Sequence, residues 1–220
     1  MKKIIMALTA ALFVATSASA FSLTGGIAYG HSAETRLNND FSLTEETEAE
    51  EKIGFNVGLC NVIAGPLGWF TDIQALWPIS TVSKTDDGTT TFTPTKQFNI
   101  NAVLGPALCF NLNDATNLHI GAGIDINYNT KEFEPDWDGV KQATNQTFNW
   151  GPAVKADLNF MLLGFIGIGV TCDVGFLWGE TKLDVDWKEG AEQNTKHPDS
   201  YKNFTLLFVP SVNAVIKLGK

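Results

Sequence analysis

The chain has 220 residues, of which 15 are lysine or arginine and 24 are aspartate or glutamate, so its formal net charge is −9. This acidic balance disfavours nucleic acid and anionic lipid as the main partners, because both are themselves negatively charged. Beyond the first 20 residues no apolar stretch reaches ~18 residues, which excludes a membrane-spanning helix there.

The first 20 residues have the pattern of a secretory signal peptide. Positive charge at 1–3 precedes a largely apolar run at 4–15, and Ala-Ser-Ala at 18–20 offers the small residues of a cleavage site. We therefore predict a signal peptide over 1–20 and a single domain over 21–220. Cleavage removes two lysines and leaves 13 basic against 24 acidic residues, a formal charge of −11.

The remaining chain predicts eight β-strands. Their signal is a period of two, in which large apolar residues alternate with small or polar ones. The segment 117–128 shows the alternation most clearly, with Leu118 and Ile120 on one face and His119 and Gly121 on the other. In chain order, the predicted strands are 21–30, 52–63, 69–80, 98–110, 117–128, 147–160, 165–180 and 203–217.

The predicted connections alternate in length. Short turns at 65–68, 113–116 and 161–164 separate long loops at 31–51, 81–96, 129–146 and 181–202. This alternation is typical of up-and-down outer-membrane barrels, in which the short turns lie on the periplasmic side. The fold class predicted is therefore all-β: an up-and-down antiparallel transmembrane β-barrel of about eight strands with long extracellular loops.

The long loops contain most of the acidic residues. Glu45, Glu46, Glu48, Glu50 and Glu51 lie in the first loop, and we interpret them as a solvated acidic surface. The segment 136–139, Asp-Trp-Asp-Gly, is only a fragment of a calcium-binding loop and lacks the ligands that would follow it. The dipeptide Asp-Gly at 87–88 predicts the tip of a hairpin that extends the barrel.

The composition of the two faces favours a membrane barrel over a soluble one. The apolar rows contain Phe, Trp, Leu and Ile side by side, whereas the opposite rows contain Gly, Asn, Ala and charged residues. A narrow barrel has room inside only for the row of mostly small residues. A charge facing lipid at mid-membrane would in addition cost about 2–4 kcal/mol. We therefore expect the large apolar rows to face hydrocarbon.

The inward rows predict a polar network in the lumen, whose members are Asp72, His119, Asp125, Lys155, Asp157, Asp173 and Lys217. Charges in a narrow lumen must be paired or hydrated, so Lys155 is expected to meet Asp125 or Asp173. We interpret the network as a structural plug. The alternative is a gated polar path, in which the excess of carboxylates favours cations.

Aromatic residues cluster near the ends of the predicted strands, where amphipathic rings prefer the membrane interface. Near the short turns these are Phe21, Phe110 and Phe160. Near the long loops the predicted interface aromatics are Tyr29, Trp77, Phe98, Tyr128, Phe148, Trp150, Trp178 and Phe204. Pro106, Pro152 and Pro210 lie inside strands and remove ladder donors, which predicts bulges or local bends.

The sequence indicates neither an enzyme nor a cofactor or metal site. His31-Ser32 follows the first strand, where such a pair could face lipid A, and lipid A modification is the less favoured alternative. No acidic residue is placed to orient the histidine, so no catalytic residue is expected. Cys60, Cys109 and Cys172 are too few and too scattered for a disulfide scaffold or a cysteine-rich metal site. We interpret them as packing residues, with a Cys60–Cys109 disulfide as the less favoured alternative.

The signal, strand count and loop alternation together resemble small eight-stranded outer-membrane proteins of the OmpA transmembrane, OmpX and OmpW type. The leader sequence and the Gly-Pro strands also look like the treponemal small outer-membrane proteins, a family of unknown function. The resemblance to OmpX implies a non-enzymatic protein whose long loops meet the host or environment. We also expect the barrel to contact outer-membrane lipid and to be monomeric. The alternative, implied by similarity to OmpW, is a narrow channel for small solutes.

Overall fold

The computed structural model describes residues 20–38, 41–85, 88–92, 96–133, 140–187 and 200–219. No helix within these ranges is long and apolar enough to span a bilayer. Residues 1–19 of the predicted signal peptide and the acidic segment 136–139 lie outside them. The described strands are β1 (Ala20–Leu37), β2 (Leu43–Ala64), β3 (Leu67–Thr85), β4 (Gly88–Phe92), β5 (Lys96–Asn113), β6 (Thr116–Phe133), β7 (Val140–Met161), β8 (Ile166–Trp187) and β9 (Ser200–Gly219).

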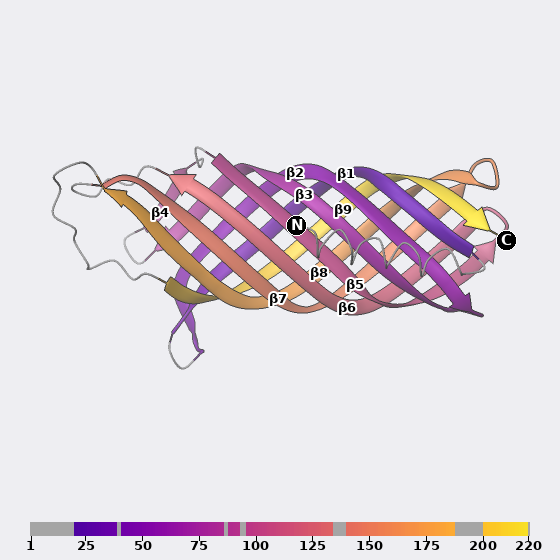
Figure 1. The fold of residues 1–220 in the computed structure, drawn as a ribbon, viewed down its shortest axis with the longest axis horizontal. Coiled ribbons are helices and arrows are strands. Elements are labelled where there is room, and N and C mark those ends of the chain that lie inside the picture. Colours follow the sequence, from indigo (N-terminus) through magenta and orange to yellow (C-terminus); the bar gives the residue numbers. More distant parts are fainter. Residues whose placement is uncertain are drawn as a thin grey trace.

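Eight of these strands close into a ring. The order is β2-β1-β9-β8-β7-β6-β5-β3, and pairing of β2 with β3 closes it. Every pairing is antiparallel, and the strands run obliquely to the long axis of the barrel (Figure 1). The short strand β4 pairs only with residues 81–85 of β3, which forms the predicted hairpin extension. The predicted up-and-down eight-stranded barrel is confirmed.

The short turns lie where the sequence predicts them. Gly65 and Gly164 adopt φ values of 56° and 72°, a left-handed conformation that glycine reaches without strain. Between β5 and β6, the side chain of Asn113 accepts a hydrogen bond from the backbone N–H of Ala115 at 2.9 Å. These turns gather at one end of the barrel, together with the C-terminal end of β9 (Figure 1).

The large apolar rows point away from the lumen, as predicted. Val154, Ile124 and Val212 are 49%, 50% and 65% exposed, although all three lie in the middle of long strands. In the outward rows of 98–110, 118–128, 148–160, 166–178 and 204–216 every residue is uncharged. In water these side chains would form a wide exposed apolar surface, which is unfavourable. The surface therefore requires the hydrocarbon of a membrane around it. The protein is therefore a transmembrane β-barrel.

The strands are longer than the sequence predicts. We expected a loop over 31–51, but β1 continues to Leu37 and β2 begins at Leu43. The expected loops at 129–146 and 181–202 are likewise shortened by strand residues on both sides. Outside the membrane both faces of a strand meet polar surroundings, so the alternation of apolar and polar residues that reveals a strand disappears there.

The predicted bulges at the three strand prolines are wrong, because the register is the same on either side of each. Each proline keeps its pairing with one neighbouring strand and interrupts it with the other. Pro152 lies opposite Ile124 of β6, whereas the pairing with β8 skips residues 151 and 152 and then resumes unshifted. A missing ladder donor is thus tolerated here as a local gap. The same holds at Pro106 and Pro210.

Candidate functional site: the barrel lumen

The lumen is filled by side chains in successive layers. The inward positions of β3, read from the short-turn end, are Phe70, Asp72, Gln74 and Leu76, each at most 1% exposed. Phe70 belongs to an apolar cluster, Asp72 and Gln74 to a charged layer, and Leu76 to a second apolar cluster. Apolar and charged layers therefore alternate along the barrel axis.

The charged layer is built around Lys155 of β7. Its Nζ forms an ion pair with Asp72 of β3, across the lumen, and lies 3.4 Å from Oδ1 of Asp157. Gln74 Nε2 donates to Oδ2 of Asp173 at 2.6 Å, and Gln74 Oε1 accepts from Asn101 Nδ2 at 3.0 Å. Since Lys155 is only 4% exposed, its charge is balanced by these carboxylates rather than by water.

The expected partner of Lys155 was wrong. Its ion pairs are with Asp72 and Asp157, whereas Asp173 lies opposite it in the β7–β8 register without forming one. A lysine side chain is long enough to cross a narrow lumen, so one partner, Asp72, comes from a strand that is not a neighbour of β7, whereas Asp157 lies on β7 itself. Asp125 also points into this layer and is 1% exposed.

The other two predicted lumen residues lie nearer the short-turn end. His119 is 7% exposed, and its Nδ1 lies 3.8 Å from Oδ2 of Asp157. Lys217 is half-buried, and its Nζ lies 3.5 Å from Oδ1 of Asn117. The structure thus places all seven predicted residues on the lumen side of the barrel, but not in one cluster.

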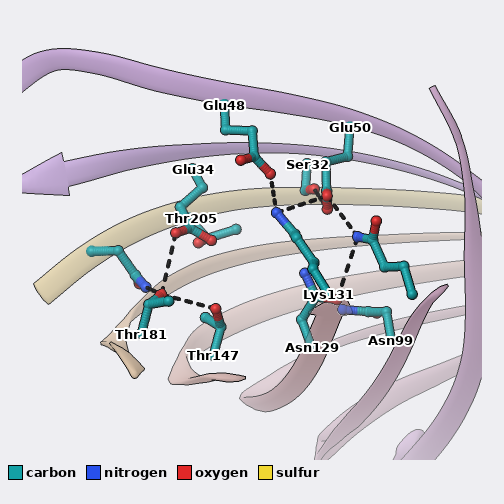
Figure 2. A network of polar contacts seen from close by, with 12 residues as sticks. Ser32, Glu34, Glu48, Glu50, Asn99, Asn129, Lys131, Thr147, Thr181 and Thr205 are labelled. Atoms are coloured by element: carbon teal, nitrogen blue, oxygen red, sulfur yellow. Dashed lines mark hydrogen bonds and ion pairs between the residues drawn. The ribbon is translucent and has the colours of Figure 1, made fainter. Parts of the chain in front are cut away.

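A second polar network lies inside the barrel, on the side of the long loops (Figure 2). Lys131 forms ion pairs with Glu48 and, at 2.8 Å, with Oε1 of Glu50. Lys52 lies 2.8 Å from the other carboxylate oxygen of Glu50, and its Nζ donates to Ser32 Oγ at 2.9 Å. Glu50 and Lys52 are 3% and 2% exposed, so the centre of this network is as dry as the charged layer, whereas the side chain of Glu48 is 22% exposed.

The sequence reasoning missed this network. We interpreted Glu48 and Glu50 as solvated loop residues, and this interpretation is wrong, because both lie on β2 and pair with lysines inside the barrel. The signal that could have revealed the network is the alternation of inward and outward residues along β2. Glu48, Glu50 and Lys52 continue the every-second-residue row of Gly54, Asn56 and Gly58 that faces the lumen.

The apolar cluster at Phe70 depends on a glycine opposite its ring. A Cβ on Gly121 of β6 would lie 2.2 Å from Cε1 of Phe70. We predict that Gly121→Ala lowers the free energy of unfolding by about 1–3 kcal/mol, because the ring must move within a filled lumen. In a Phe70→Leu background the same substitution should lower the free energy of unfolding by measurably less. A double-mutant cycle, measured by unfolding in denaturant, checks this. Equal costs in the two backgrounds would contradict the proposed contact.

The structure separates His31 from Ser32. His31 is exposed on the outer face of β1, whereas Ser32 is buried in the lumen network with Lys52 and Glu50. Adjacent strand residues point to opposite faces, so the two side chains cannot act as a catalytic pair.

The predicted interface aromatics follow the outer surface of the barrel. Tyr29, Trp77, Tyr128, Phe148, Trp150 and Trp178 are 38–59% exposed. Phe98 and Phe204 are partly covered by neighbouring rings, with centroids 5.7 Å from Trp77 and 5.2 Å from Trp178 respectively. These rings therefore face outward from the barrel, and we refer to them together as the aromatic belt.

No protein-family model and no curated protein matches the chain. Several solved structures do. The outer membrane protein OprG from Pseudomonas aeruginosa is 12% identical, with a TM-score of 0.62 over 92% of this chain and 97% of OprG. The outer membrane protein AlkL is 10% identical, with a TM-score of 0.47 over 90% of each chain. The attachment invasion locus protein Ail of Yersinia pestis is 12% identical, with a TM-score of 0.42 over 89% of this chain and 99% of Ail. The likeness to OprG shows that the fold is that of a small outer-membrane β-barrel.

Proposed function

We propose that the protein is a closed, non-enzymatic scaffold of the bacterial outer membrane that holds its long loops outside the cell for contact with host or environment. The observation that carries this proposal is the filling of the lumen. A water-filled channel leaves its wall residues accessible, yet Phe70, Leu76, Val103 and Lys155 are 0–4% exposed. The predicted lumen network then serves as a plug.

The length of the strands supports the same proposal. A transmembrane strand needs about 9–11 residues, whereas β2, β7 and β8 each have 22. On β8, Trp178 lies in the aromatic belt that we place at the membrane interface, and the strand continues to Trp187. The extra residues form a wall beyond the lipid, and the network around Lys131 braces it from within.

Conductance separates the scaffold from the alternative, a narrow channel for small solutes. We expect the mature chain, refolded in detergent and inserted into planar bilayers at neutral pH, to show no discrete openings. An open porin inserted in the same way is the positive control for the membrane. Discrete openings by the wild-type protein would reject the closed scaffold and favour the channel.

The surface role is tested separately. Replacing 188–199 by a short turn should leave heat-modifiable migration intact, because the replaced segment lies outside the described barrel strands. The same replacement should reduce attachment of expressing bacteria to cultured epithelial cells. The matched control is deletion of Leu162, which shortens the turn between β7 and β8 at the opposite end of the barrel. This deletion should leave attachment unchanged. Undiminished attachment after replacement of each long loop would contradict the proposed role.

A further inference from the structure

Two thiols and an imidazole converge near the short-turn end of the lumen. Cys60 comes from β2, Cys109 from β5 and His119 from β6, and one donor atom of each lies within 4.8 Å of the other two. Cys109 and His119 are direct partners in the β5–β6 register. Cys60 is separated from them by β3, which crosses at Gly68, where a Cβ would lie only 3.0 Å from Cys109 Sγ. The missing side chain therefore leaves room for the two thiols to approach.

The spacing of the donors suits a tetrahedral metal ion. The two Sγ atoms are 3.5 Å apart, and both cysteines are free. Two thiolates bound to one Zn²⁺ at about 2.3 Å in tetrahedral geometry lie about 3.8 Å apart, whereas a disulfide requires about 2.05 Å. The observed separation is thus close to the metal-bound value.

The surroundings also resemble those of a metal centre. A cavity of about 130 Å³ adjoins the three residues, and strand-end residues including Gly65 and Lys217 line it, so it lies toward the periplasmic end. Nδ1 of His119 is buried without a hydrogen-bond partner and lies 3.8 Å from Oδ2 of Asp157. Metal-bound histidines commonly have a carboxylate near their second ring nitrogen, and Asp157 occupies that place here.

We propose that Cys60, Cys109 and His119 bind a thiophilic divalent cation, Zn²⁺ or Cd²⁺, that enters from the periplasm. Thiolate and imidazole are the ligands these ions prefer, and the cavity leaves the fourth position to water. The sequence predicted no metal site, because the ligands are scattered along the chain and meet only when the ring closes. The site is independent of the scaffold function proposed above.

Co²⁺ is the probe for the test, because cobalt bound to thiolate absorbs in the near ultraviolet whereas cobalt bound to carboxylates does not. We expect the reduced, refolded mature chain to develop this band at one Co²⁺ per protein and to lose it when Zn²⁺ is added. Cys60→Ser and Cys109→Ser should abolish the band, and His119→Ala should weaken it. Cys172→Ser and His31→Ala are the matched controls and should keep it.

Heat-modifiable migration shows that each variant is folded. A folded wild-type protein that gives no band after reduction would overturn the proposal, and so would a band that persists in Cys60→Ser. Thiol titration before reduction identifies the competing disulfide. A disulfide would show in this titration as two thiols fewer before reduction than after it. If the reduced protein then also gives no Co²⁺ band, the cysteine pair belongs to redox chemistry and the metal site is rejected.

Discussion

Lys155→Met is expected to lower the free energy of unfolding by about 3–5 kcal/mol, because it leaves Asp72 and Asp157 buried without their cation. Methionine nearly preserves the volume, so the effect reports the charge rather than a cavity. Denaturant unfolding in lipid vesicles, followed by tryptophan fluorescence and heat-modifiable migration, measures it. The double variant Lys155→Met/Asp72→Asn should recover part of the loss, because one carboxylate fewer is left unpaired.

The matched control is Lys96→Met. Lys96 Nζ lies 2.9 Å from Oε2 of Glu132, so it also forms a direct ion pair, but the lysine side chain is 77% exposed. Solvent screens such a pair, so its removal should cost less than about 1 kcal/mol. Equal losses from the two lysines would show that the charged layer is hydrated, and the interpretation of a dry plug would then be wrong.

Val154→Arg is expected to cost about 2–4 kcal/mol in a lipid bilayer, because the side chain lies at the middle of the outward apolar surface. The penalty arises from placing a cation in hydrocarbon. It should therefore fall with depth, toward zero at the interface. Unfolding titrations in vesicles of phosphatidylcholine compare the variant with the wild-type barrel.

Gln146→Arg provides the control on the same strand. Gln146 lies on the same face of β7 as Val154, beyond Phe148 and Trp150, and is exposed. If the aromatic belt lies at the membrane interface, this arginine meets water and costs less than about 0.5 kcal/mol. Similar costs at the two positions would contradict both the depth of Val154 and the proposed place of the belt.

The central part of each strand could be read from the sequence because it separates two different solvents. Leu118 and Ile120 face lipid while His119 and Gly121 face a narrow lumen, so the residue types alternate sharply. The outer parts of the strands could not be read in this way. At 43–51 apolar and polar residues do not alternate, and Glu48 and Glu50 therefore looked like loop residues although they belong to β2.

The strand count, the up-and-down order, the outward apolar face and the inward polar rows could all be predicted from the amino-acid sequence, because they follow from local alternation and turn composition. Which inward residues contact one another became known only from the folded barrel. Lys155 reaches Asp72, Lys131 reaches Glu50, and Cys60 approaches Cys109, each from a strand that is not a neighbour in the ring. Contacts across a lumen depend on the number, tilt and stagger of all the strands together, and no local segment encodes that geometry.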